Sequence, residues 1–164
     1  MSEGFDPTEH IGKDLPPMTV VIERGPVSNF ATAITDTNPI YHNADKARAA
    51  GFDNIPAPPT WGFGMLNWGR FPEVQPEGAK DVSPVMFAIG GLMQTGGMIL
   101  HGEEEFIYHR PIVVGDKLTS SGKIRDIYAK EGKSTMTFVV TETHWRDEAG
   151  DPVLSETMTL IHRA

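Results

Sequence analysis

A carboxylate and an imidazole lie six positions apart in the stretch DTNPIYH, which spans Asp36 to His42. Near neutral pH such a pair can hold one water molecule and pass protons in both directions. Pro39 fixes its own φ and restricts Asn38 before it, so this turn is stiff enough to hold two side chains in one geometry. The stretch is therefore a candidate acid–base site. The alternative is structural, because an Asp near an Asn-Pro turn is often only a turn or capping residue.

Two short helices are expected to flank this turn. The β-branched run Met18–Glu23 predicts a strand, which Gly25-Pro26 ends. Apolar residues then recur at helical spacing, at Val27, Phe30, Ala31 and Ile34. This pattern predicts an amphipathic helix that starts at Pro26 and ends just before Asp36. Asp45–Ala50 favours a second helix, and Gly51 can serve as its C-cap.

The most apolar part of the chain follows a proline-rich segment. Three prolines between Pro56 and Pro59 forbid helix there, whereas Thr60–Trp68 is apolar almost throughout. A helix that is apolar on all sides is a buried helix, so Thr60–Trp68 is predicted to form a central helix. Its glycines weaken it as an isolated helix, but they allow close approach of a sheet or a ligand.

Arg70–Met98 shows little periodicity and is rich in glycine and proline. A long irregular segment in a compact domain is usually functional or mobile. Because Val85–Ile89 and the residues after it are apolar, this segment is expected to fold over an apolar ligand rather than to act as a solvated linker. The alternative is a short helix packed on the core.

The remainder of the chain, from Ile99 onward, is predicted to be all strand. Turn signals separate four runs, at Glu103–His109, Lys117–Tyr128, Ser134–Trp145 and Val153–His162. With the early strand they make one five-stranded antiparallel sheet, which must bury one face, and the apolar helix is the natural object to lie in it. The fold class is therefore α+β, a sheet wrapped around a central helix. Residues 1–17 are expected to be a mobile arm, and residues 18–164 a single domain.

Composition excludes several function classes. The formal net charge is −8, so nucleic acid is an unfavourable partner. No run approaches the length of a membrane span, and the N-terminal stretch has no export-signal pattern, so the cytoplasm is the expected location. The absence of cysteine removes disulfides and thiolate chemistry.

One local excess of basic residues stands against the acidic background, at Lys117, Lys123, Arg125, Lys130 and Lys133. The preferred interpretation is a solvated edge of the sheet. The functional alternative is a patch that attracts a phosphorylated ligand such as coenzyme A.

Other ionisable residues give weaker signals. His101 and His109 match no metal-binding pattern and are expected to be strand-edge or core histidines, so no metal site is predicted. The acidic run Glu103–Glu105 is expected to be the solvated end of a strand.

Three stretches together resemble a known family. They are Phe30–His42 with Ala47–Phe52 after it, Ile55–Thr60, and His101–Leu118. The chain resembles the MaoC-like dehydratases and (R)-specific enoyl-CoA hydratases from about residue 18 onward, in the branch related to the N-terminal dehydratase domain of fungal fatty acid synthase. The resemblance implies the hot-dog fold, no cofactor, and reversible hydration of trans-2-enoyl thioesters to (3R)-hydroxyacyl thioesters.

The resemblance also implies residue roles. The family's usual motif is Asp-x-Asn-Pro-x-His, which this chain matches by type, except that Tyr41 adds one residue before the histidine. Asp36 and His42 are then the catalytic pair, and Asn38 orients the water or the carboxylate. The thioester oxygen is expected to accept hydrogen bonds from backbone N–H groups after the last proline, at Thr60, Trp61 and Gly62.

Two other functions remain open for a hot-dog chain. It could be a non-catalytic subunit that forms the acyl pocket of a heteromeric dehydratase. It could also be a thioesterase, but that reaction normally needs a carboxylate near the central helix, and Thr60–Trp68 carries none.

The expected partners are an acyl thioester and another hot-dog chain. The thioester is one of coenzyme A or of acyl carrier protein, and the acidic chain disfavours the acidic carrier. One sheet around one helix leaves a long strand edge, which is usually paired, so a homodimer or a heteromer with another hot-dog chain is expected.

Overall fold

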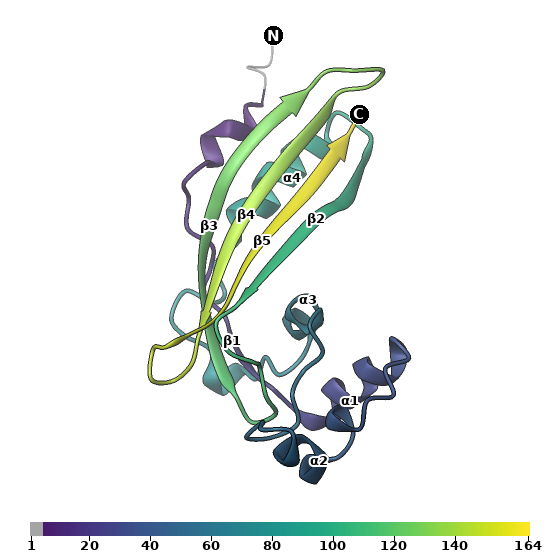
Figure 1. Ribbon diagram of the computed structural model, residues 1–164. Coiled ribbons are helices and arrows are strands. Elements are labelled where there is room, and N and C mark those ends of the chain that lie inside the picture. The colour runs from purple at the N-terminus through teal and green to yellow at the C-terminus, as the bar shows by residue number, and fades with distance from the viewer. Residues whose placement is uncertain (1–4) are drawn as a thin grey trace.

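The computed structural model describes residues 5–164, which form one five-stranded antiparallel sheet with helices against its inner face (Figure 1). The strand order is β1-β3-β4-β5-β2. The strands are β1 (Thr19–Val21), β2 (Met98–Tyr108), β3 (Lys117–Lys130), β4 (Met136–Arg146) and β5 (Pro152–Arg163). Strands β2 to β5 lie where the sequence predicts them, and the hot-dog arrangement of the α+β fold is confirmed.

Within residues 5–164, four α-helices and four 3₁₀ turns connect and cover the strands. The helices are α1 (Arg24–Ala33), α2 (Ala44–Ala49), α3 (Trp61–Gly64) and α4 (Pro84–Met93). The 3₁₀ turns are η1 (Pro7–His10), η2 (Pro39–Tyr41), η3 (Met65–Asn67) and η4 (Pro72–Val74). In Figure 1, α1, α2 and α3 gather at the β1 end of the sheet, whereas α4 lies against the other half.

The predicted central helix is broken into two short pieces. Thr60–Trp68 contains the single α-turn of α3 followed by the 3₁₀ turn η3. Gly62 of α3 is packed so closely on the sheet that an added Cβ would lie 2.7 Å from Phe106 Cε1 and 3.0 Å from Leu154 Cδ2. A glycine therefore permits this approach, at the cost of helical stability.

The segment Arg70–Met98 supplies the rest of the inner layer. Its helix α4 places Ala88 and Leu92 on Ile124 and Val139, which makes a second core cluster. The alternative of a short helix on the core is therefore confirmed for Pro84–Met93. The larger core cluster lies at the α3 end and includes the fully buried side chains Trp61, Met65, Leu118, Trp145 and Leu154.

The segment expected as a mobile arm runs along β3 in this structure. The Gly12 N–H donates to Ile124 O (2.8 Å), and the Leu15 N–H donates to Gly122 O (2.8 Å). Leu15 also packs against the core cluster under α4. This segment therefore continues the edge of the sheet beyond the short strand β1. Residues 1–4 of the expected arm lie outside the described residues.

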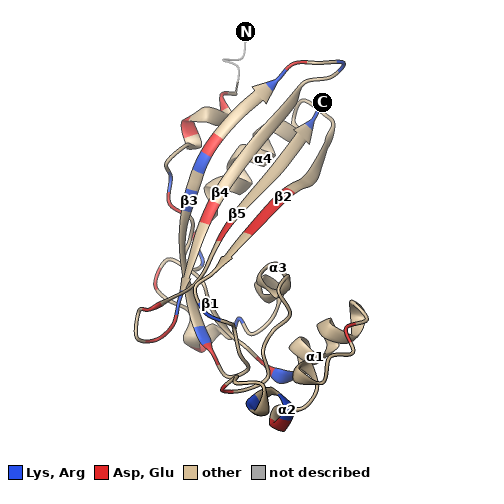
Figure 2. Cartoon of the chain, viewed as in Figure 1, with Lys and Arg blue, Asp and Glu red and all other residues tan. Residues whose placement is uncertain are grey.

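The basic residues of β3 largely face acids or aromatic rings. Lys117 Nζ lies 3.2 Å from Glu148 Oε1, and Lys123 Nζ lies 3.2 Å from Glu142 Oε1. Lys130 lies over the stacked rings of Tyr128 and Phe138. Figure 2 shows basic residues along β3 and acidic ones on β2. This arrangement favours the interpretation of a solvated sheet over that of a free basic patch. None of the helices within residues 5–164 is long and apolar enough to cross a membrane.

Candidate functional site

The Asp36–His42 stretch forms the turn that leads out of α1. Thr35 has a positive φ of 59°, and the Asp36 N–H then donates to Ala31 O (2.9 Å). The Asp36 carboxylate accepts the Asn38 N–H at 2.9 Å, and the Asn38 side-chain oxygen accepts the Ile40 N–H at 3.2 Å. Both side chains thus cap backbone N–H groups, which is the structural role that Asp and Asn commonly have in turns.

His42 approaches Asp36 through the backbone. Its Nε2 lies 2.8 Å from the Asp36 carbonyl oxygen, which can only accept, so Nε2 carries the proton in this contact. In the neutral ring Nδ1 is then the free acceptor. The structure therefore brings Asp36, Asn38 and His42 together on one turn, but it does not join the imidazole to the carboxylate.

Tyr41, rather than His42, lines the neighbouring cleft. This cleft of about 380 Å³ is formed by Tyr41, Phe52, Pro56, Ala57, Pro59, Tyr108, His109, Arg110, Pro111 and Ile112. Burial and the nearby Asp36 carboxylate raise the pKa of Tyr41 above its usual value. The residue that lengthens the motif by one position therefore places its phenol where the turn meets the proline-rich segment.

The far wall of the cleft leads to the predicted backbone donors. The Tyr108 hydroxyl donates to Pro59 O, and burial raises the pKa of Tyr108 to about 12, against the lowering effect of a hydrogen bond from the Gly62 backbone. The Trp61 N–H is already engaged, because it donates to Pro58 O at 2.9 Å. Of the three predicted donors, the Thr60 N–H therefore has no hydrogen-bond partner within residues 5–164, whereas the Gly62 N–H faces the Tyr108 hydroxyl.

Comparison with known proteins assigns the family. The family model described as "FAS1-like, dehydratase domain region" matches residues 9–156. This chain belongs to the FAS1-like dehydratase family. A UPF0336 protein of Streptomyces avermitilis is 31% identical over 156 residues, a match that covers 94% of this chain and 93% of the relative.

Solved structures show the same fold at lower identity. The HadBC (3R-hydroxyacyl-ACP dehydratase) complex of Mycobacterium tuberculosis matches with a TM-score of 0.68 and 19% identity, covering 96% of this chain and 98% of that one. The ChsH1-ChsH2 complex of the same organism matches with a TM-score of 0.71 and 22% identity, covering 91% and 83%. Both neighbours are complexes of two different chains, and their likeness to this chain shows the fold.

A second polar cluster of this FAS1-like dehydratase chain lies on the inner face of the sheet, away from the Asp36 turn. Glu156 of β5 is 7% exposed, and its Oε2 has no hydrogen-bond partner among residues 5–164. Burial, followed by the charge of Glu104, raises the pKa of Glu156 to about 7. The Trp145 indole opposes this shift, although its Nε1 also finds no hydrogen-bond geometry within the described residues.

Glu104 corrects the expectation of a solvated acidic strand end. Its side chain is only 9% exposed and lies 3.1 Å from His101 Nε2, and Phe63 stacks on that imidazole. Burial raises the pKa of Glu104, and His101 opposes the shift. Strand alternation would have revealed this position, because residue 104 shares a face with the inward-facing Phe106 and with Tyr108. Within residues 5–164 no group of three His, Asp or Glu side chains is placed to hold a metal ion.

Proposed function

We propose that this chain binds an acyl thioester in the Tyr41 cleft and hydrates trans-2-enoyl thioesters reversibly to (3R)-hydroxyacyl thioesters. The observation that carries the proposal is the cleft, which brings the turn containing Asp36 and His42 up to the segment ending at Thr60 and Gly62. A structural neighbour named as a 3R-hydroxyacyl-ACP dehydratase supports this reaction class. Coenzyme A is the proposed carrier, because a chain with net charge −8 repels an acidic carrier protein.

The reaction assigns a role to each polar group of the site. The hydroxyl of water adds to the β-carbon and a proton adds to the α-carbon, while negative charge develops on the thioester oxygen. Asp36 polarises the water, Asn38 orients it, and His42 exchanges the proton through Nδ1, the nitrogen that its contact with the Asp36 carbonyl leaves free. The backbone N–H groups of Thr60 and Gly62 stabilise the developing oxyanion, which replaces the Tyr108 hydroxyl as the acceptor for Gly62.

A second candidate function is favoured by the position of Tyr41. Because this phenol, and not the His42 imidazole, lines the cleft, the chain could hold the acyl thioester while another hot-dog chain supplies the acid–base pair. The heteromeric neighbours HadBC and ChsH1-ChsH2 support such an arrangement. In that case the protein is the acyl-binding subunit of a heteromeric dehydratase.

Either function calls for assembly through the outer edge of the sheet. Among the strands of residues 5–164, β2 pairs with β5 alone, and it carries exposed apolar side chains, among them Met98, Leu100 and Ile107. Unpaired apolar strand edges of this length are normally covered by another chain. We expect a dimer by light scattering at micromolar concentration, and Leu100→Lys should shift it toward monomer. A wild-type monomer would contradict this assembly.

Activity of the purified chain tests the proposed function. Enoyl absorbance is followed for a series of trans-2-enoyl-CoA substrates from crotonyl to decenoyl, and calorimetry measures binding of the same thioesters. Turnover with a (3R) product supports the hydratase, whereas binding without turnover supports the acyl-binding subunit. Tyr41→Trp should weaken binding in both cases, because it fills the cleft. Thioester binding that is absent, or indifferent to Tyr41→Trp, would contradict both functions.

A further inference from the structure

A cavity of about 330 Å³ lies between the inner face of the sheet and the segment that leads into α4, and it shares no lining residue with the Tyr41 cleft. Its apolar wall comes from several elements, including Leu15, Met18, Leu66, Met86 and Met158. This volume falls in the range of small-molecule sites, and the wall is mostly hydrophobic as such sites usually are.

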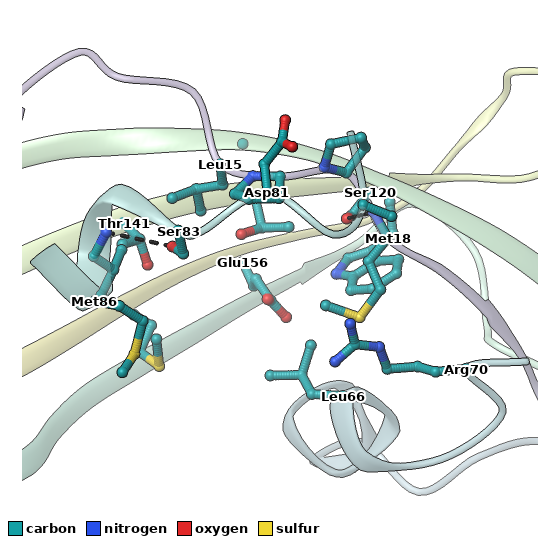
Figure 3. A pocket seen from close by; sticks show the side chains of 18 residues that line it. Leu15, Met18, Leu66, Arg70, Asp81, Ser83, Met86, Ser120, Thr141 and Glu156 are labelled. Carbon is teal, nitrogen blue, oxygen red and sulfur yellow. Dashed lines mark hydrogen bonds between the residues drawn. The ribbon is translucent and has the colours of Figure 1, made fainter. Parts of the chain in front are cut away.

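Glu156 makes this cavity unlike a plain apolar pocket. Figure 3 shows its carboxyl group projecting from β5 into the space between Leu66 and the opposite wall. The side chain is 7% exposed, and Oε2 has no partner within the described part of the chain. A buried carboxyl oxygen without a hydrogen bond costs free energy that a ligand atom of the right kind can recover.

We propose that this cavity receives the acyl chain of the substrate and that Glu156 hydrogen-bonds a hydroxyl or carbonyl oxygen carried on that chain. The assignment rests on the proposed function and names its substrate class, acyl thioesters oxygenated away from the thioester. A saturated chain would cover the carboxyl without satisfying it, whereas an oxygen at that point supplies the missing partner.

The cavity and the Gly62 end of the site lie close together along β5. Leu154 packs on Gly62, and Glu156 follows on the same face of β5, two residues and so roughly 7 Å farther along the strand. Leu66 of η3, four residues after Gly62, lines the cavity. The step along β5 from the contact between Gly62 and Leu154 to Glu156 is therefore shorter than a medium-length acyl chain.

The surroundings of Glu156 favour its neutral, donating form. The charged or titratable groups that face it are Glu104, His101 and Tyr108 of β2, with Arg70 and Asp81 on the far wall of the cavity. Burial, followed by the Glu104 charge, raises the pKa of Glu156 to about 7, against the lowering effect of the Trp145 indole N–H. A ketone can only accept a hydrogen bond, so it needs the protonated carboxyl, whereas a hydroxyl can also donate to the carboxylate.

Methionine methyl groups provide a site-specific reporter of binding. Met18, Met86 and Met158 line the cavity, whereas Met98 and Met136 lie outside it. In methyl-labelled protein, binding of decanoyl-CoA and of its keto-substituted isomers should shift the first three signals and leave the other two in place. The isomer whose oxygen reaches Glu156 should bind roughly five- to tenfold tighter than decanoyl-CoA at about pH 6, the effect of one buried hydrogen bond.

Variants separate the hydrogen bond from simple packing. Glu156→Leu should abolish the preference for the keto chain and bind decanoyl-CoA more tightly. Glu156→Gln keeps an N–H donor, so it should retain the preference for the keto chain. In wild type this preference should decline as the pH rises through about 7, whereas in Glu156→Gln it should not. Glu105→Gln, an exposed change on β2, is the matched control and should behave as wild type.

Small ketones distinguish a failure of this inference from a failure of the proposed function. If 2-octanone shifts the cavity methyl groups in wild type but not in Glu156→Leu, while no thioester binds, the oxygen subsite stands and the thioester function is wrong. If thioesters bind and turn over but Glu156→Leu leaves the preference between keto and saturated chains unchanged, the inference is overturned. It is equally overturned if no ligand moves the methyl groups of Met18, Met86 and Met158.

Discussion

The Asp36–His42 turn and the Glu156 cavity use their polar side chains in opposite ways. In the turn, Asp36 and Asn38 cap backbone N–H groups and His42 bonds a carbonyl, so most of the polar atoms have a partner within the chain. In the cavity, Glu156 is buried with an oxygen that no described residue satisfies. The difference shows that the side chains of a recognisable polar motif can hydrogen-bond mostly to their own backbone. A buried acceptor without a partner can lie instead on a strand residue that belongs to no motif.

Substitutions in the Asp36–His42 turn are expected to have the largest effect, because they remove the acid–base groups. Asp36→Asn or His42→Ala should lower kcat for enoyl-CoA hydration by roughly two to four orders of magnitude, the scale of lost acid–base catalysis. The double variant should be little worse than either single one, because residues that act as a unit are not additive. Steady-state kinetics measures this.

The control for that effect is Asp45→Asn, which removes an exposed carboxylate of α2 that pairs with Arg48. It should leave kcat unchanged. Near-full activity of both Asp36→Asn and His42→Ala would mean that a partner chain supplies the acid–base pair. This chain would then be the acyl-binding subunit.

The next largest effect is the pH dependence of stability that the buried Glu156 carboxyl causes. The pKa of Glu156 is raised to about 7 in the folded protein, so the native state holds this proton more tightly than the unfolded chain does. Stability from this group is therefore full below the unfolded pKa near 4.5 and is lost as the pH rises toward about 7. Urea unfolding should show wild type losing up to about 3 kcal/mol more than Glu156→Gln between about pH 4.5 and pH 8. If the unfolding free energies of the two proteins change with pH in parallel, the pKa of Glu156 is not raised by burial.

Sequence patterns predicted the turn and most of the sheet, because strand alternation and turn residues are local signals. They missed the break in the central helix, since the contact that requires Gly62 is made by Phe106 and Leu154, which lie far away in the chain. They also treated Glu104 as solvated, because consecutive acids suggest exposure unless the strand's inward face is already known. Glu156 gave no motif; its only signal is a carboxylate at an inward position between Leu154 and Met158.

A smaller effect concerns the packing that lies between the two regions. Gly62→Ala should destabilise the fold by about 1–3 kcal/mol, because the new Cβ would lie 2.7 Å from Phe106 Cε1. Chemical denaturation gives the value, and binding of crotonyl-CoA should weaken in parallel. A neutral Gly62→Ala would mean that α3 can move off the sheet without cost.

The smallest effect comes from the matched glycine on α4. An added Cβ at Gly90 would meet nothing within 4 Å, so Gly90→Ala should stabilise the protein by about 0.5–1 kcal/mol through helix propensity alone. Differential scanning calorimetry would detect this as a modest rise in Tm. Destabilisation instead would indicate that the exposed face of α4 is covered in the assembled protein.

The most direct test of the whole account compares kcat/KM for trans-2-decenoyl-CoA and its best keto-substituted analogue in three proteins. Asp36→Asn should lower both values by the same large factor, because it removes chemistry common to both substrates. Glu156→Leu should raise the value for the plain chain, lower it for the keto chain, and so reverse the ratio that wild type shows. The account is contradicted if Asp36→Asn changes the ratio between the substrates, or if Glu156→Leu lowers both values equally.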